Sequence, residues 1–277
     1  MNSSAGAILL EVHRTAVVHP TAKLAEGVRI GPYAVIGEQV SIGENTVIGP
    51  HAVVDAFSTL GRDCQVHAGA VIGGPSQDLK HQGEVSYLVI GDRNVIREYV
   101  TINRATDLGD ETRIGSDNLL MAYVHVAHDC HVGNHVVLAN GVTLAGHVAI
   151  EDYVTIGGMV GLHQFIRVGK MAMIGAMSRL SQDVLPYLLV EGNPPKVYGI
   201  NSTGLRRRGL DTATRGAIKK AYRLLYRSGL NVSQATAQMD EAFKKIPEIA
   251  YLVRFLAGTQ RGVTGLSGKS AVDDDDD

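Results

Sequence analysis

The sequence is poor in the residues that many folds depend on. It has no tryptophan, only 5% aromatic residues and two cysteines among 277 residues. Two cysteines, Cys64 and Cys130, cannot form a disulfide framework, so we expect free thiols in the core and a reducing compartment. No apolar run is long enough to cross a membrane, and the first residues lack the basic flank of a signal peptide. We therefore expect a cytoplasmic protein without a membrane span.

The sequence is rich instead in a six-residue period. From Val12 to Leu180 almost every sixth residue is Ile, Leu or Val, and the second place of each hexad is often Gly. A fixed short period is typical of a β-solenoid. Each hexad then forms a short strand and a turn, three hexads form a triangular coil, and the first and fifth positions point inward. Residues eighteen apart become neighbours in stacked coils, about 4.8 Å apart.

The fold class that we expect is mainly β: a left-handed parallel β-helix of hexapeptide repeats followed by a small C-terminal α-helical bundle. Asp78 and Glu84 interrupt the aliphatic ladder, which predicts a loop at about residues 75–88. A smaller loop is expected at about 107–112, where Leu108 matches the period by chance. These features predict a solenoid domain at 1–190, a connector and helical domain at 191–266, and a disordered acidic tail at 267–277.

The helical part is basic although the whole chain carries a net charge of only −2. Between Ser202 and Gly262 twelve Lys and Arg residues stand against four Asp and Glu residues, which leaves an excess of eight positive charges. This surface favours an acidic partner. Nucleic acid is not the partner that we expect, because no aromatic residues for base stacking are interleaved with the basic ones.

Histidines gather in the middle of the solenoid. The spacing of eighteen places His128 beside Gly146 and Asp129 beside His147. This arrangement offers a general base, a carboxylate to orient it, and a backbone N–H for a developing negative charge. The whole outward patch comprises His128, Asp129, Gly146, His147, His163 and Gln164. Two other interpretations stay open, ordinary surface histidines and a zinc site shared between chains.

Several motifs occur together and in a fixed order: QDLK, HVAHDC, TLAGH, LHQF, EGNPPKVYGIN and GLRRRG. In this combination the chain resembles the acyl-carrier-protein-dependent UDP-N-acetylglucosamine O-acyltransferase family, which catalyses the first step of lipid A synthesis. The resemblance covers about residues 12 to 263. It implies a homotrimer with active sites between solenoids, acyl carrier protein as donor, and UDP-N-acetylglucosamine as acceptor. It also implies a 3-hydroxyacyl chain and no metal or diffusible cofactor.

The resemblance assigns roles to particular residues. His128 is implied as the general base for the glucosamine 3-hydroxyl, Asp129 as the residue that orients it, and Gly146 as the oxyanion donor. Met173 and Ala176 fall in the region that measures the acyl chain. The residues implied to bind the sugar nucleotide or to line its site are Gln77, Asp78, Lys80, His125, His147, His163, Gln164, Asn201, Arg207 and Arg208.

The chain departs from the family pattern at Thr203, where some members have Glu, and at Asn103, where His is common.

Three competing interpretations of the function remain. A related N-acyltransferase is expected to carry an extra N-terminal domain, which Met1–Glu11 cannot supply. A zinc-dependent carbonic anhydrase of the γ type leaves the basic bundle and the QDLK loop without a purpose. A non-catalytic scaffold that binds a partner through its basic helices is the third. His128→Ala distinguishes it, because a scaffold would keep its function and an enzyme would lose turnover.

Overall fold

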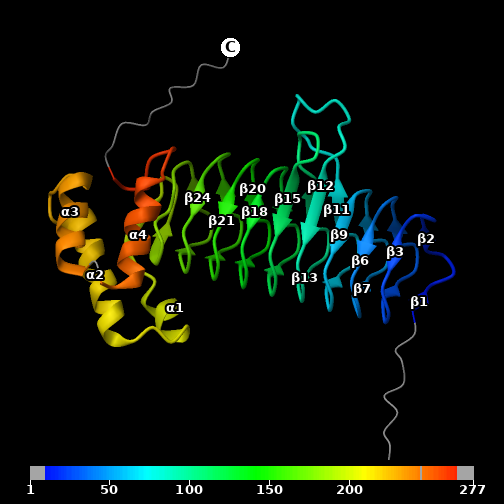
Figure 1. The fold of residues 1–277 in the computed structure, drawn as a ribbon, viewed down its shortest axis with the longest axis horizontal. Coiled ribbons are helices and arrows are strands. Elements are labelled where there is room, and N and C mark those ends of the chain that lie inside the picture. The colour runs from blue at the N-terminus through cyan, green and yellow to red at the C-terminus, as the bar shows by residue number, and fades with distance from the viewer. Residues whose placement is uncertain (1–9, 244, 267–277) are drawn as a thin grey trace, which may run out of the picture.

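The computed structural model describes residues 10–243 and 245–266. Short parallel strands wind into a triangular prism, and helices pack against its C-terminal end (Figure 1). The expected acidic tail at 267–277 lies outside the described residues. Within the described part of the chain, no helix is long and apolar enough to cross a membrane.

Three sheets form the faces of the prism, and each coil contributes one strand to each of them. Sheet I contains β1 (Glu11–Val12), β4 (Arg29–Ile30), β7 (Val47–Ile48), β10 (Gln65–Val66), β13 (Val95–Ile96), β16 (Leu119–Leu120), β19 (Val137–Leu138), β22 (Thr155–Ile156), β25 (Met173–Ile174), β27 (Leu188–Glu191) and β28 (Lys196–Ile200). Sheet II contains β2 (Val17–Val18), β5 (Val35–Ile36), β8 (Val53–Val54), β11 (Val71–Gly74), β14 (Thr101–Asn103), β17 (His125–Val126), β20 (Thr143–Leu144), β23 (Gly161–Leu162) and β26 (Arg179–Leu180). Sheet III contains β3 (Lys23–Leu24), β6 (Ser41–Ile42), β9 (Ser58–Leu60), β12 (Tyr87–Ile90), β15 (Glu111–Ile114), β18 (His131–Val132), β21 (Ala149–Ile150) and β24 (Arg167–Val168). The expected β-helix with C-terminal helices is confirmed.

The hexad positions determine the core. First-position residues such as Leu120 and Val126 are buried, and so are fifth-position residues such as Val136. Cys64 and Cys130 occupy fifth positions as free, fully buried thiols, and burial raises the pKa of Cys130 to about 12. Thiols protonated in this way are poor nucleophiles, so both cysteines act as small apolar side chains.

The fourth position of the hexad forms the turn at each edge of the prism. Its residues adopt a left-handed backbone conformation, as Asp129 (φ 60°) and His147 (φ 59°) do. Glycine is frequent at the second position of the hexad because neighbouring coils leave no room there for a side chain. A Cβ atom added to Gly115 would lie 2.6 Å from the carbonyl oxygen of Gly133 in the next coil.

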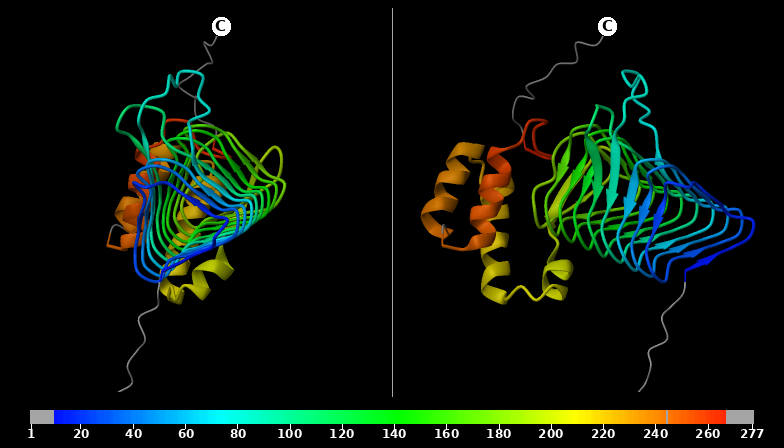
Figure 2. Two further views of the ribbon diagram at one scale, coloured as in Figure 1. Left: turned by 90° about the vertical axis from the view of Figure 1, so that its right-hand side faces the viewer. Right: turned by 45° about the vertical axis from the view of Figure 1, so that its right-hand side comes forward.

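Two loops leave the prism from the same edge, the one between sheets II and III, which we call the loop edge. The first loop joins β11 to β12 and the second joins β14 to β15, so they comprise residues 75–86 and 104–110. They are the excursions visible above the prism in Figure 2. Leu108, in the second loop, is 74% exposed and takes no part in the core despite its place in the period.

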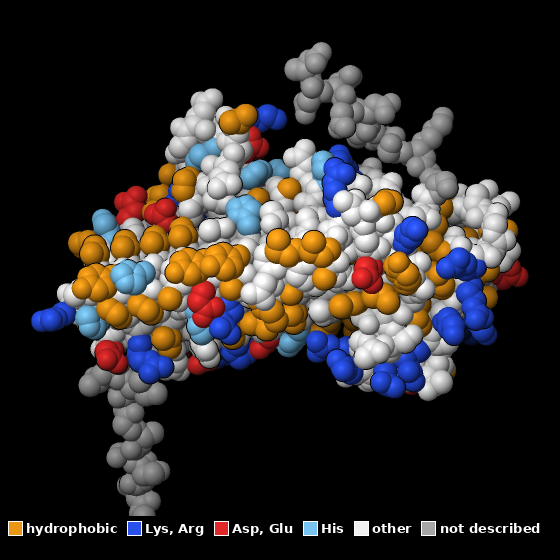
Figure 3. Space-filling view, turned by 180° about the vertical axis from the view of Figure 1, so that it is seen from behind, with side chains coloured by type: hydrophobic (Ala, Val, Ile, Leu, Met, Phe, Trp, Pro, Cys, Tyr) orange, Lys and Arg blue, Asp and Glu red, His pale blue; other side chains and the backbone are white. Residues whose placement is uncertain are grey.

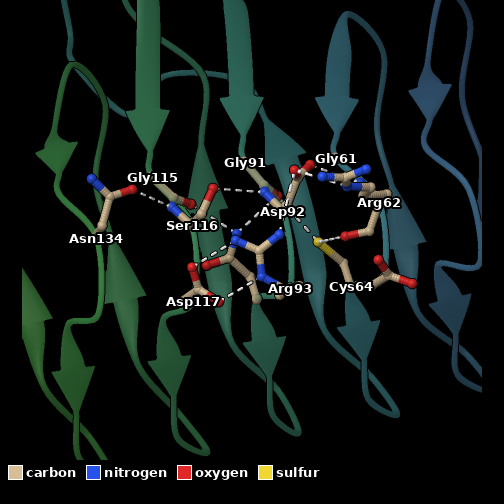
Figure 4. A network of polar contacts seen from close by, with 12 residues as sticks. Gly61, Arg62, Cys64, Gly91, Asp92, Arg93, Gly115, Ser116, Asp117 and Asn134 are labelled. Atoms are coloured by element: carbon tan, nitrogen blue, oxygen red, sulfur yellow. Dashed lines mark hydrogen bonds and ion pairs between the residues drawn. The ribbon is translucent and has the colours of Figure 1, made fainter.

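The other two edges differ in character. Along the edge between sheets III and I, the polar edge, Arg93 donates two hydrogen bonds to Asp117 (2.7 and 2.8 Å), and Ser116 N donates to Asn134 (2.8 Å) (Figure 4). Along the edge between sheets I and II, the apolar edge, large side chains stand more than half exposed. They are Tyr33, Tyr99, Tyr123, Met159 and Met177.

The outward sixth positions repeat this contrast. Sheet I presents apolar side chains at several of these positions, such as Val95 and Leu119. Sheet II presents valines from Val17 to Val71 and more polar residues from Thr101 onward. Sheet III presents polar or charged ones at Lys23, Ser41, Thr59, Arg113, His131 and Arg167. Figure 3 shows exposed hydrophobic side chains in rows along the length of the prism. The exposed apolar rows on sheets I and II therefore have the composition of a surface that is covered by another molecule.

The C-terminal part begins with the antiparallel pair β27 and β28. The helices are α1 (Ser202–Arg207), α2 (Thr212–Arg227), α3 (Val232–Phe243) and α4 (Pro247–Ala257). Asp211 caps α2 by accepting a hydrogen bond from Thr214 N (2.8 Å), and Pro247 stands at the first turn of α4. After α4 the chain returns to the last coil of the prism, where Thr264 N donates to Asp183 O (2.9 Å).

Candidate active site at the loop edge

Successive turns of the loop edge carry the residues that the spacing of eighteen brings together. His128 and Asp129 lie between β17 and β18, and Gly146 and His147 lie one coil further, between β20 and β21. His147 N donates to the carbonyl oxygen of His128 (3.1 Å), which fixes the two turns relative to each other. The next turn, between β23 and β24, carries Gln164.

His128 and Asp129 form a hydrogen-bonded pair. Nδ1 of His128 lies 2.8 Å from Oδ2 of Asp129, and both side chains are largely buried, with 13% and 11% of their area exposed. A carboxylate only accepts hydrogen bonds, so Nδ1 must carry the proton of this bond. The other ring nitrogen, Nε2, is then left unprotonated in the neutral ring and can accept a proton.

The loops contribute two residues that sequence reasoning missed. The hydroxyl of Thr106 donates to Asp129 Oδ2 (2.9 Å), and Thr106 N donates to Oδ1 (3.2 Å). Ser76, from the first loop, lies 2.8 Å from the Thr106 hydroxyl. Both loops therefore support the carboxylate. Their positions in the sequence could have indicated this. Both loops replace turns on the edge that carries Asp129, the first loop two coils before Asp129 and the second one coil before it.

Burial alone would raise the pKa of the Asp129 carboxyl. Hydrogen bonds from His128 and from the side chain and backbone of Thr106 outweigh this effect, and the pKa lies below its usual value. Asp129 is therefore ionised at neutral pH and stabilises a positive charge on the adjacent imidazole.

Gly146 lies directly under the ring of His128. A Cβ atom at Gly146 would lie 2.4 Å from Cε1 and 2.7 Å from Nε2 of His128, so no larger residue fits beside this ring. Among the described residues, the N–H of Gly146 donates to no acceptor of the protein. His147 contacts the His128 ring edge-on, at 5.4 Å between centroids, and stacks on Phe165 at 4.6 Å.

The same corner has the donors that a zinc ion needs. Within the described part of the chain, one group offers three ligand atoms within 4.8 Å of one another, namely His128, Asp129 and His147. Zinc sites with three protein ligands have this composition. However, Oδ2 of Asp129 already accepts hydrogen bonds from His128 and Thr106, and a metal ion would have to replace them.

Other predicted residues flank the pair. His125 lies on β17, where its Nδ1 is 2.7 Å from the Thr101 hydroxyl; burial, and then the nearby His128, lower the pKa of His125. His163 lies two coils beyond His128, and its Nδ1 lies 2.9 Å from Nη2 of Arg261. The sequence analysis did not assign Arg261 to the site. The first loop carries Gln77, Asp78 and Lys80 on this edge, with Lys80 N donating to Asp78 Oδ1 (2.8 Å).

A second set of predicted residues lies elsewhere on the chain. Asn201 caps α1 and donates to the carbonyl oxygen of Met171 (3.0 Å), and the guanidinium of Arg208 lies 4.5 Å from the ring centroid of Tyr153. Both contacts are on the polar edge, and Arg207 is exposed in the same helix. Met173 points outward from sheet I, and Ala176 lies on the apolar edge. A single chain therefore does not bring these residues to His128.

The departures from the family pattern fall in both regions. Asn103 ends β14 and donates to the carbonyl oxygen of Pro75 (2.7 Å), which ties the base of the first loop to sheet II. Its Oδ1 is buried without a partner in the protein. Thr203 lies exposed in the first turn of α1.

Comparison with known proteins identifies this arrangement. The model for domain 2 of UDP N-acetylglucosamine O-acyltransferase matches residues 183–264, and the bacterial transferase hexapeptide model matches 21–56, 39–74 and 111–146. An acyl-[acyl-carrier-protein]–UDP-N-acetylglucosamine O-acyltransferase from Leptothrix cholodnii is 48% identical over 92% of this chain and 99% of the relative. The chain belongs to the UDP-N-acetylglucosamine O-acyltransferase family.

Other members of this acyltransferase family agree with that assignment. The enzyme of the same name from Thermodesulfovibrio yellowstonii is 45% identical over 91% of this chain and 98% of its own length. Among solved structures, the family member from Acinetobacter baumannii has a TM-score of 0.88 and 41% identity, covering 91% of this chain and 99% of its own. The UDP-N-acetylglucosamine acyltransferase from Francisella novicida has the same TM-score at 40% identity, covering 91% and 93%. The similarity thus extends over the prism and the helices together.

Proposed function

We infer that this protein transfers an acyl group from acyl carrier protein to UDP-N-acetylglucosamine, the first step of lipid A biosynthesis. The observation that carries the mechanism is the His128–Asp129 pair, whose imidazole lies against the backbone of Gly146. An acyl transfer to a hydroxyl needs a base for the hydroxyl and a donor for the oxyanion, and this pair and this amide provide both.

In the proposed mechanism, Nε2 of His128 takes the proton from the glucosamine 3-hydroxyl as its oxygen attacks the thioester carbonyl of a 3-hydroxyacyl chain. The C–O bond forms, and the carbonyl oxygen becomes an oxyanion that the N–H of Gly146 stabilises. When the intermediate collapses, the C–S bond breaks, and the imidazolium returns the proton to the departing thiolate of the carrier. Asp129 stabilises the imidazolium throughout, and Thr106 and Ser76 hold Asp129 in place.

The two separated sets of residues meet if three chains assemble around the apolar edge. With this edge at a threefold axis, sheet I of one chain faces sheet II of the next across a cleft. The polar edge of one chain then approaches the loop edge of its neighbour at the mouth of that cleft. The exposed apolar side chains on the apolar edge and on both faces support this arrangement, since an assembly buries such surfaces.

The heights of the residues along the prism fit this trimer. Tyr153, which Arg208 contacts, belongs to the coil that carries Gly146 and His147. Met171, which Asn201 contacts, belongs to the coil of Gln164. A threefold axis keeps neighbouring chains at equal height, so we propose that Arg208 and Asn201 complete the sugar-nucleotide site of the adjacent chain. A guanidinium there suits the diphosphate. Met173 and Ala176 then line the deeper part of the same cleft, where the acyl chain lies.

The basic helices provide a docking surface for the donor. A groove of about 540 Å³ between α2 and α3 has an apolar floor that includes Leu224, Ala242 and Phe243. The cationic side chains of Lys220, Arg223 and Arg227 surround it. We propose that acyl carrier protein, which is acidic, docks here. The free buried thiols of Cys64 and Cys130 fit the cytoplasm as the proposed compartment.

The direct test is an assay with UDP-N-acetylglucosamine and a panel of acyl carrier protein thioesters that differ in chain length and 3-hydroxylation. We expect O-acylated sugar nucleotide with at least one donor. His128→Ala should abolish turnover while the protein remains a folded trimer by light scattering and circular dichroism. A His128→Ala variant that retains wild-type turnover would overturn the proposed mechanism. His131→Ala, on the outer face of sheet III, is the matched control and should remain active.

A further inference from the structure

The segment after α4, residues 259–264, crosses back onto the loop edge, and we call it the strap. The hydroxyl of Thr259 donates to Oδ2 of the buried Asp183 (2.7 Å), and Asp183 N donates to the carbonyl oxygen of Gly262 (3.0 Å). The side chain of Arg167 donates to Gly258 O (2.9 Å) just before the strap begins. The strap is therefore anchored to the prism on both sides of Arg261.

Arg261 reaches from the strap to a histidine of the candidate site. Its Nη2 lies 2.9 Å from Nδ1 of His163, and both side chains are half-buried. A guanidinium has only donor groups, so Nδ1 of His163 must be the acceptor of this bond. The carbonyl oxygen of Gln164 lies 3.3 Å from the same Nδ1 and would favour the opposite tautomer, with the proton on Nδ1. Arg261 therefore decides between the two tautomers.

We propose that Arg261 is a positioning residue for acyl transfer, which holds His163 in the tautomer with its proton on Nε2 so that the ring donates a hydrogen bond to the bound sugar nucleotide. This inference rests on the proposed function for its ligand, although the tautomer itself does not. An N–H donor at this place pairs with a hydroxyl, carbonyl or phosphate oxygen of the acceptor. Because the strap continues from α4, the helical domain is thereby connected directly to the sugar-nucleotide site.

The first experiment observes the tautomer in the unmodified trimer. Protein with ¹⁵N-labelled histidine is compared by NMR with His163→Gln, which identifies the His163 signals. We expect the shift pattern of an Nε2–H imidazole in the wild type and a change of that pattern in Arg261→Gln. A protonated Nδ1 at His163 in the wild type overturns the proposal whatever the activity of the protein, and it does so without requiring any variant at position 261 to fold.

The second experiment measures kinetics. Arg261→Gln should raise KM for UDP-N-acetylglucosamine by about tenfold, the effect of one charge-assisted hydrogen bond, with a smaller change in kcat. The effects of Arg261→Gln and His163→Gln should not add in the double variant, because both remove the same interaction. Arg254→Gln, an exposed residue of α4 that loses the same charge, is the control and should keep the wild-type KM. Additive effects, or an unchanged KM for Arg261→Gln, would contradict the proposal even if the enzyme is fully active.

Discussion

The imidazole of His128 lies so close to the backbone of Gly146 that no side chain fits between them, since a Cβ atom there would approach Cε1 to 2.4 Å. Gly146→Ala must therefore displace the ring. We expect kcat/KM to fall by about 100-fold, as for other misplacements of about 1 Å in active sites. Gly216→Ala, in α2 with open space around its Cα, is the control and should leave the activity unchanged. A fully active Gly146→Ala would show that the ring does not act from this position.

The Asp129 carboxylate should affect both activity and acid stability. Asp129→Asn removes the negative charge and replaces one of the two acceptor oxygens with an NH2 donor, which no longer holds the proton on Nδ1, and we expect kcat to fall by at least about 100-fold. Because the pKa of Asp129 is lowered in the folded protein, its ionisation stabilises the fold above the ordinary carboxyl pKa. This stabilisation disappears as the pH falls through the lowered pKa. The difference in melting temperature between wild type and Asp129→Asn should thus be largest near neutral pH and shrink on acidification below about pH 4. A difference that stays constant down to pH 2 would argue against an ionised Asp129.

A site shared between chains predicts complementation. His128→Ala and Arg208→Ala should each be nearly inactive as pure trimers. When equal amounts of the two variants are unfolded and refolded together, each mixed trimer contains one site with both intact residues. This is about a quarter of all sites, and activity should return to that extent. Mixing His128→Ala with Asp129→Asn is the control, because both changes fall in the same half of the site, and no activity should return. If verified mixed trimers of the first pair stay inactive, His128 and Arg208 do not act in a site formed by two chains.

The apolar edge predicts where assembly is sensitive. Tyr123→Glu places a charge among side chains that the proposed trimer buries, and we expect smaller species by analytical ultracentrifugation together with loss of activity. His131→Glu, on the polar sheet III, should assemble normally. A trimeric and active Tyr123→Glu protein would exclude the apolar edge as the axis of the assembly.

The proposed acyl cleft makes a prediction for chain length. Ala176 is exposed on the apolar edge, and Ala176→Met should favour shorter acyl donors because the longer side chain fills the far end of the cleft. Ala122→Met lies on the same edge three coils earlier and should leave the preference unchanged. Relative rates with a series of acyl carrier protein thioesters measure both, and an unchanged profile for Ala176→Met would refute the assignment.

Removal of metal distinguishes acyl transfer from zinc chemistry. Although His128, Asp129 and His147 offer three ligand atoms, the proposed mechanism uses His128 as a base. Protein dialysed against a chelator should therefore keep its full transferase activity, and elemental analysis should find no stoichiometric zinc. Activity that is lost with the metal and restored by zinc alone would reverse this assignment.

Much of the architecture follows from the period of six. The inward first and fifth positions, exemplified by Val126 and Cys130, could be predicted because a repeat that short leaves one way to bury its aliphatic side chains. The spacing of eighteen also placed Gly146 under His128, since stacked coils keep a constant register. The contrast between the sheets could also be predicted, because every third hexad lies on the same sheet. Comparing the sixth positions of such hexads separates apolar residues such as Leu119 on sheet I from polar residues such as His131 on sheet III.

The remaining residues of the candidate site lie in loops and other irregular segments. Thr106 and Ser76 reach Asp129 from loops whose conformation no repeat determines. Arg261 contacts His163 across 98 residues of sequence, through a strap whose path depends on how the helices pack. No pattern in a single sequence connects such residues.

The lengths of the two excursions from the prism have a consequence for variation among related enzymes. Residues paired across the first loop, such as Gln65 and Val95, are thirty apart, and those across the second, such as Thr101 and His125, are twenty-four apart. Both loops leave the prism and return to it at the same edge, so their extra residues change the sequence separation but not the facing of later hexads. Six residues added as a strand and turn within a coil would instead rotate all subsequent side chains by a third of a revolution and move His128 away from the loop edge. Residues can therefore be added to the excursions, outside the segments that hold Ser76 and Thr106 against Asp129, without turning the coils that follow. The continuous wall between them tolerates only whole added turns.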